Sequence, residues 1–173
     1  MSTQAEATAA LYVGYFHEAH AAMRTVVSGL SPALLDWKPG EETNSIAALI
    51  AHTLDSERAL TAIVAGVTLP RDREAAFRVS ALDSERLVAM IDATEREVDG
   101  FLGGLTQDLL DAPIERPMRT ASGAFWLLHA AVHSREHIGQ ATLTRQLAEQ
   151  ATAPGQAPRM ADHAASRGSL TEG

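Results

Sequence analysis

His129-Ala-Ala-Val-His133-Ser-Arg-Glu-His137-Ile-Gly-Gln140 places three histidines four residues apart, in a stretch whose composition predicts a helix. On an α-helix, side chains four residues apart lie on the same face, one turn from each other. Two imidazoles in this arrangement can bind one divalent ion, because histidine is the commonest protein ligand for zinc-like metals. A helix supplies only two adjacent ligands of this kind, so a third ligand must come from another part of the chain.

The spacing limits which two histidines can act together. Residues 129 and 137 are about 12 Å apart along the axis at 1.5 Å per residue, so both cannot bind one small ion together with His133. The pair is therefore His129 and His133, or His133 and His137. A candidate for the third ligand is His52, which lies in another helical stretch and has small residues one turn away.

Composition and charge narrow the class of protein. The 173 residues suffice for one domain with a substantial core, and 46% hydrophobic but only 5% aromatic residues favour close helix packing over sheets. A formal net charge of −8 without a Lys/Arg run argues against nucleic acid as the main partner. There is no cysteine, no signal-peptide pattern and no apolar stretch of the ~20 residues that would span a membrane. We therefore expect a soluble cytoplasmic protein with no membrane partner.

Hydrophobic periodicity predicts an all-α fold built as a four-helix bundle over residues 1–150. The predicted helices cover about 3–29, 44–66, 83–102 and 122–149. For the last helix the predicted core stripe is Phe125, Leu128, Val132 and Leu143. Residues 151–173 are small and polar, which predicts a mobile or loosely docked C-terminal tail.

The connections are long for a simple up-and-down bundle, and this affects the choice of ligands. About 15 residues join the second and third helices, and they could extend to ~50 Å, which is more than the length of a helix. Such a connection can carry the chain back along the bundle and leave these two helices parallel. The parallel arrangement brings His52 level with His133 and His137, whereas an up-and-down order favours His129 and His133. Both choices remain open on this argument.

Two sets of short motifs resemble the DinB/YfiT-like metalloprotein superfamily. The first set resembles the N-terminal half of the family's sequences. It consists of Leu49-Ile-Ala-His52, preceded by Leu35-Asp-Trp37-Lys-Pro39 and by an Asn44-Ser45-Ile46 helix start. The second set resembles the C-terminal half and consists of the three-histidine stretch through Gln140, followed by Arg145-Gln-Leu147. The similarity covers most of residues 9–148 and leaves the tail outside.

This resemblance implies a four-helix bundle with long crossover connections in up-down-down-up order. Carried over residue by residue, it implies His52, His133 and His137 as metal ligands and a homodimer as the assembly. Some members of the family are thiol-dependent transferases or isomerases that use low-molecular-weight bacterial thiols. Others resemble metal-dependent hydrolases, and many have no known activity.

Three histidine ligands leave one coordination position open, as in catalytic zinc sites. We therefore expect a divalent ion, zinc or nickel, with a small-molecule substrate and in some reactions a low-molecular-weight thiol as a cofactor. An open ion can lower the pKa of bound water or of a thiol, so the ligands do not distinguish a hydrolase from a thiol transferase. The alternatives are a non-catalytic bundle that binds a metal or small ligand as sensor or store, and a metal-free interaction module.

Three further residues are candidates for supporting roles. His133-Ser-Arg-Glu136-His137 matches the inverted zinc-peptidase pattern, in which the glutamate is the general base. Because no distant carboxylate ligand is evident, a peptidase is not favoured and Glu136 is only a weak catalytic candidate. His129 is expected to line the pocket, and Asp55 could support a ligand imidazole from one turn after His52.

Overall fold

Four long helices form most of the part of the chain that the computed structural model describes, residues 3–117 and 119–153. They are α1 (Gln4–Val27), α3 (Ile46–Val64), α5 (Ser84–Gly103) and α7 (Gly123–Thr152). Each begins after a residue whose side-chain oxygen accepts a hydrogen bond from a backbone N–H of the first turn, as N-cap residues do. These caps are Thr3, Ser45, Asp83 and Ser122. The predicted helical class is confirmed, and the predicted helix bounds lie within about three residues of those observed.

The connections between the long helices contain short elements that periodicity did not predict. They hold α2 (Pro32–Leu35), α4 (Arg73–Phe77) and α6 (Gln107–Asp111). Strands β1 (Pro113–Arg116) and β2 (Arg119–Ser122) then form an antiparallel hairpin in which Pro113 is paired with Ser122 and Arg116 with Arg119. Pro113 excludes a helix there, but proline is tolerated as the first residue of an edge strand.

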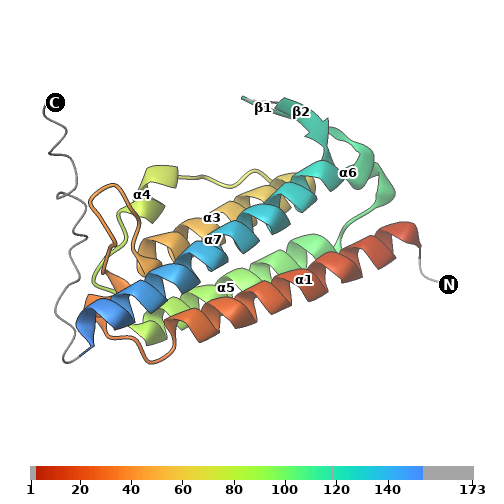
Figure 1. Cartoon of the computed structure of the whole chain (residues 1–173). Helices are drawn as coiled ribbons and strands as arrows, with labels where there is room; N and C mark the ends of the chain where they lie inside the picture. Colours follow the sequence, from red (N-terminus) through yellow and green to blue (C-terminus); the bar gives the residue numbers. More distant parts are fainter. Residues whose placement is uncertain (1–2, 118, 154–173) are drawn as a thin grey trace, which may run out of the picture.

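The long helices lie side by side, and their direction can be followed by colour in Figure 1. One core cluster joins the first halves of α3 and α5 to the second halves of α1 and α7, through Ile50, Leu87, Met23 and Ile138 among others. The other cluster joins the opposite halves. Helices α3 and α5 therefore begin at the same end, and the connection that carries α4 returns along the outside of the helices.

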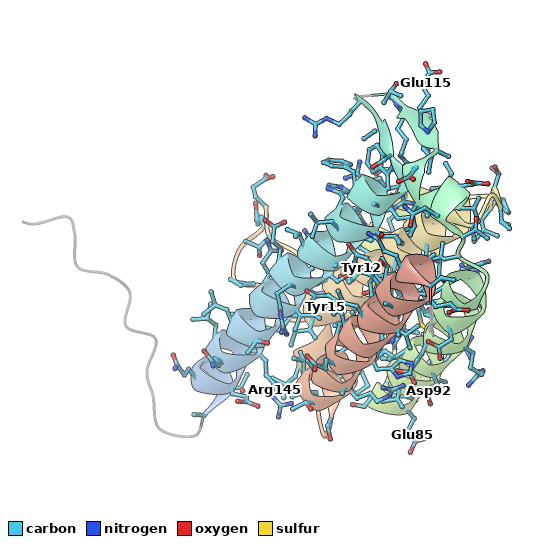
Figure 2. All side chains as sticks on the ribbon, turned by 90° about the vertical axis from the view of Figure 1, so that its right-hand side faces the viewer. Tyr12, Tyr15, Glu85, Asp92, Glu115 and Arg145 are labelled. Atoms are coloured by element: carbon cyan, nitrogen blue, oxygen red, sulfur yellow. The ribbon has the colours of Figure 1, made fainter. Side chains whose placement is uncertain are left out.

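Three contacts fix α7 against its neighbours. Arg145 donates hydrogen bonds from Nη1 to the carbonyls of Thr25, Val26 and Ser28 at the end of α1, at 2.9, 2.9 and 3.1 Å. Tyr15, which like Arg145 is labelled in Figure 2, donates its hydroxyl to the carbonyl of Ala131 at 2.8 Å. Gly123 begins α7 where any side chain would collide with the carbonyl of Leu109 in α6. The Gly123 contact holds the start of α7 close to α6, and the contacts of Tyr15 and Arg145 hold the rest of α7 against α1.

The apolar face predicted for α7 was wrong. Leu128, Val132 and Leu143 are 54%, 51% and 56% exposed, and Phe125 is half-buried. The buried face instead contains Trp126, Leu127 and Ile138 together with small residues, namely Ala130, Ala131, Ser134, Ala141, Thr144 and Ala148. Small side chains let α7 lie close to α3, so this face gains its packing from short interhelical distances and not from large side chains.

None of the helices in the described ranges is long and apolar enough to cross a membrane. The predicted tail, apart from the end of α7, falls on residues 154–173, which lie outside the described residues.

Candidate metal centre

Helices α3 and α7 bring three of the predicted histidines together. The Nε2 atom of His133 lies 3.3 Å from that of His52 and 3.2 Å from that of His137. One nitrogen from each ring lies within 4.8 Å of the other two. His52 is buried, whereas His133 and His137 are partly exposed. These three imidazoles could hold a metal ion.

The spacing of the nitrogens fits a tetrahedral ion. For Zn–N bonds of about 2.0–2.1 Å, tetrahedral geometry places ligand nitrogens about 3.3 Å apart. The two shortest Nε2–Nε2 separations are close to this value. A set of three nitrogen donors and no carboxylate suits zinc, nickel or a similar divalent ion.

One contact orients the ring of His137. The ring Nδ1 of His137 lies 2.8 Å from Oε1 of Gln140. If Nδ1–H donates to this oxygen, then Nε2 carries the lone pair and faces the other two rings, as in metal sites where a second partner orients the ligand. His52 is held differently, because its ring stacks on Phe77 of α4 with the centroids 4.1 Å apart.

None of the three rings forms a salt bridge with an Asp or Glu of residues 3–117 or 119–153. The Nδ1 atoms of His52 and His133 are buried and form no hydrogen bond with any described residue. Burial, followed by the charge of His137, lowers the pKa of both His52 and His133 to about 4. The two rings are therefore neutral at pH 7, which is the form of histidine that binds a metal.

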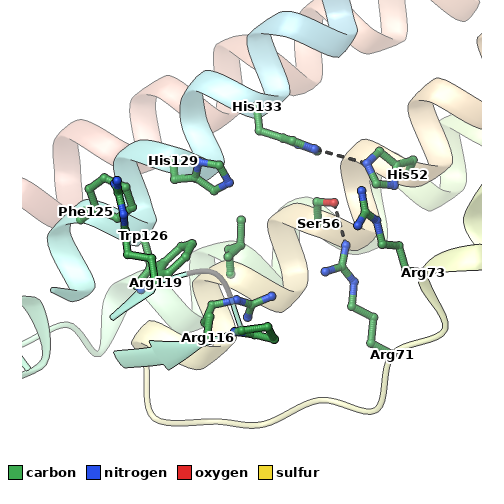
Figure 3. Close-up of a pocket in the computed structure, with 12 residues that line it drawn as sticks. His52, Ser56, Arg71, Arg73, Arg116, Arg119, Phe125, Trp126, His129 and His133 are labelled. Carbon is green, nitrogen blue, oxygen red and sulfur yellow. Dashed lines mark hydrogen bonds between the residues drawn. The ribbon is translucent and has the colours of Figure 1, made fainter. Parts of the chain in front are cut away.

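A pocket of about 610 Å³ opens beside the histidines (Figure 3). Helices α3 and α7, the hairpin and the connection after α3 all contribute to its wall. Aromatic and aliphatic side chains form part of it, including Phe125, Trp126 and Leu60. His52 and His133 lie in the same wall, so a ligand in this pocket would contact the face on which the imidazoles converge.

The structure places the other candidates apart from the three rings. His129 is on the pocket wall and exposed, with its ring centroid 6.2 Å from that of His133. Glu136 is exposed and does not line the pocket. Asp55 does not support His52 as predicted, because its Oδ2 accepts a 2.6 Å hydrogen bond from Nε of Arg71.

Several residues of the site were not predicted from the sequence. Gln140 was named only as the end of the three-histidine stretch, although its position three residues after His137 allows the contact seen here. Phe77 and the pocket arginines lie in connections for which the sequence predicted no short elements. The segment around Arg71-Asp72-Arg73 is rich in charge, but nothing in the sequence places it next to His52.

Comparison with known proteins gives one family and a shared fold. A model of the DinB superfamily matches residues 15–141. A solved structure of a conserved protein from Enterococcus faecalis is 17% identical, with a TM-score of 0.69 over 81% of this chain and 96% of that chain. A DinB-like protein from Bacillus subtilis is 18% identical, with a TM-score of 0.63 over 79% of this chain and 91% of that chain. No curated protein matches the chain.

Proposed function

Because this chain belongs to the DinB superfamily, we propose that it is a metal-dependent enzyme in which His52, His133 and His137 hold a divalent ion. The reaction is a thiol-dependent transfer or a hydrolysis of a small molecule. One observation carries this proposal: three nitrogen atoms converge within 4.8 Å at the wall of a pocket, with no acidic partner. The expected bundle in up-down-down-up order belongs to the proposal, and the two core clusters support it.

The protein residues have distinct roles in this proposal. The three imidazoles place their Nε2 atoms close together, and Gln140 holds the ring of His137. Phe77 covers His52 and keeps water from that side of the site. The bound ion would supply Lewis acidity, which lowers the pKa of a water or thiol that it contacts. Both reactions use this property, so hydrolase and transferase remain alternatives within the proposal.

Two further residues have roles that can be tested separately. His129 faces the pocket and is placed to contact a bound substrate or thiol. Glu136 stays a predicted general base, and the exposure of its side chain makes this the weakest part of the proposal. If Glu136 acts as the base, Glu136→Gln lowers turnover without changing metal content.

Metal analysis of untagged protein tests the ligand set. We expect about one equivalent of zinc or nickel in the wild type by elemental analysis, and much less in His52→Ala. His129→Ala is the matched control because this histidine belongs to the same helix and the same pocket. Full metal content in His52→Ala, or its loss only in His129→Ala, would contradict the assignment.

Activity screens then divide the functional alternatives. Metal-loaded protein is assayed with low-molecular-weight thiols plus electrophiles, and separately with ester and amide substrates. Turnover that disappears in His133→Ala supports an enzyme and shows which reaction it performs. Stoichiometric metal without turnover of any substrate favours the second candidate, a metal- or ligand-binding bundle, for which the pocket offers a binding volume of about 610 Å³.

The proposed assembly is a homodimer, and the exposed apolar side chains of α7 support it. Leu128, Val132 and Leu143 are exposed on this helix, and Leu147 is 37% exposed. Apolar patches of this kind commonly mark an interface. Light scattering tests the assembly: Leu143→Glu is expected to give monomers, and Leu11→Glu on α1, where the side chain is 71% exposed, is the control. Equal masses for the two variants would contradict an interface on α7.

A further inference from the structure

Four arginines surround the pocket beside the candidate metal centre. We define the arginine rim as Arg71, Arg73, Arg116 and Arg119, all of which line the pocket. The whole chain has only 14 Lys and Arg residues against 22 Asp and Glu, so this concentration of positive charge runs against the overall balance. Among the described residues, no Asp or Glu lines the pocket with them. The pocket is therefore a locally cationic site in an acidic protein.

The rim comes from two separate connections. Arg71 and Arg73 come from the segment between α3 and α5, and Arg116 and Arg119 from the hairpin before α7. Figure 3 shows Arg71 and Arg73 on the side of the pocket nearer His52, and Arg116 and Arg119 on the side nearer Trp126. Their convergence depends on the fold, because nothing in the sequence links these two connections.

Three of the four guanidinium groups are held in a way that leaves donors available. Arg71 donates from Nε to Asp55 at 2.6 Å and from Nη2 to Ser56 at 2.8 Å. The guanidinium carbon of Arg116 lies 5.4 Å from the centre of the Trp126 ring. That of Arg119 lies 4.9 Å from the centre of the Phe125 ring. Aromatic faces orient a guanidinium without using its N–H groups, so these groups can bind a ligand.

The positive charge of three of the four rim arginines is not compensated by a salt bridge with a described residue. Only Arg71 forms a salt bridge there, whereas Arg73, Arg116 and Arg119 form none with residues 3–117 or 119–153. Burial, followed by the charge of Arg71, lowers the pKa of Arg116. Cations that repel one another in a half-buried pocket are stabilised when an anion binds between them.

We propose that this pocket binds a substrate carrying an oxyanion, a carboxylate or a phosphate group, through the arginine rim. The inference deepens the proposed function, on which it rests for the role of the histidines, by naming the chemical class of the substrate. Arginine forms paired hydrogen bonds to carboxylate and phosphate oxygens, and such charge-assisted bonds are the stronger ones. The anionic group lies at the rim, the apolar part contacts Phe125 and Trp126, and the reacting end extends toward His52 and His133.

Fluorescence of Trp126 can report binding of simple probes. The chain has two tryptophans, and Trp37→Phe leaves Trp126 of the pocket as the only one. The probes are benzoate, phenyl phosphate and the uncharged benzamide, titrated into full-length protein with and without added zinc. Benzoate and phenyl phosphate compare the two oxyanions, and benzamide measures the contribution of the ring alone.

We expect at least one anionic probe to bind metal-free protein about tenfold more tightly than benzamide, as for one charge-assisted hydrogen bond. Arg116→Gln raises the dissociation constant of that probe about tenfold. The matched control is Arg96→Gln, an exposed arginine of α5 that lies outside the pocket, and it changes the constant less than about twofold. If circular dichroism shows that Arg116→Gln is unfolded, the exposed Arg73 and Arg119 are tested in its place.

Three results would overturn the inference. The first is equal affinity for benzoate, phenyl phosphate and benzamide. The second is an equal change of the dissociation constant in the rim variants and in Arg96→Gln. The third is anion binding that requires zinc and does not change when a rim arginine is replaced. The third would place the anion on the metal alone. A protein that binds no metal but still binds the anionic probes through the rim would refute the proposed metal site and keep the inference, so the two failures are distinguishable.

Discussion

Two clusters, each built around one buried histidine, lie on different sides of α3 and differ in their partners. On the side of α1, His20 places Nε2 2.7 Å from Oε2 of Glu57 and Nδ1 3.2 Å from Oε2 of Glu95. On the side of α7, His52 lies against His133 and His137 and stacks on Phe77. The first imidazole faces two carboxylates, whereas the second faces two other imidazoles.

The charged residues and the pockets next to the two clusters also differ. Burial opposes ionisation of Glu95. Hydrogen bonds from Arg24, together with the charge of Arg24 and of the nearby histidines, outweigh burial and lower the pKa of this carboxyl, so an ion-pair network closes the first cluster. His20 lines neither described pocket, whereas His52 and His133 line the pocket of about 610 Å³. The comparison teaches that partners, and not burial, separate a structural histidine from a candidate ligand. A cluster of imidazoles without a carboxylate could hold a cation from outside the protein.

Removal of the central ligand should give the largest difference between the clusters. His133→Ala is expected to weaken zinc binding by more than the 10–100-fold that is typical for loss of a supporting hydrogen bond, so more than about 100-fold. His20→Ala should leave zinc affinity within about threefold, since the two clusters share no ligand. Competition titrations with a chromophoric chelator measure both constants. Similar losses for the two variants would mean that the clusters are not separate.

Disruption of the ion-pair cluster should affect stability and not metal. Glu57→Leu leaves His20 buried without its shortest carboxylate contact, and we expect a loss of about 3–5 kcal/mol in the free energy of unfolding. Urea titration of the metal-free protein measures it. Glu97→Leu is the matched control, because its surface ion pair with Arg58 contributes less than about 1 kcal/mol. If Glu57→Leu is no more destabilised than this control, the His20 cluster has no structural role.

Acidification should destabilise the metal-free protein through the metal cluster. The pKa of His52 and of His133 is lowered to about 4 in the folded chain, against about 6.5 when unfolded. Near pH 5 the unfolded state then binds about two more protons than the folded state at these positions, so stability falls as pH decreases from 6.5 toward 4.

Urea titrations from pH 7 to pH 4.5 in a chelator measure this slope. A His52→Gln/His133→Gln variant is the control, because it keeps every carboxylate that titrates in the same range and should show a shallower decline. Equal slopes for the wild type and this variant would mean that the two rings are not neutral in the folded protein.

The smallest expected effect comes from the residue that orients one ligand. Gln140→Ala should weaken zinc binding about tenfold, at the lower end of the range for loss of a supporting hydrogen bond, with little change in stability. Gln146→Ala, an exposed glutamine on the same helix, is the control. An unchanged affinity in Gln140→Ala would show that the contact between His137 and Gln140 does not support the ligand.

The sequence predicted the long helices well because their signals are local. Capping residues such as Thr3, Ser45, Asp83 and Ser122 act within one turn of their own helix, so a single stretch contains all that is needed. The apolar face of α7 was mispredicted for the opposite reason. The predicted face followed the large apolar residues of the helix, but α7 packs closely against its neighbours mainly through alanines. The distance between two helices cannot be predicted from the sequence of one of them.

By itself, the sequence determined that His133 and His137 share one face, since the 3.6-residue period of a helix fixes the position of i and i+4. The resemblance of the sequence to the DinB family also singled out His52 as the candidate third ligand. Only the tertiary structure decided that His52 meets these two rings while His20 meets carboxylates, because contacts between helices depend on their axial offset and rotation. The arginine rim was decided in the same way, since two distant connections form one pocket only after the helices have packed.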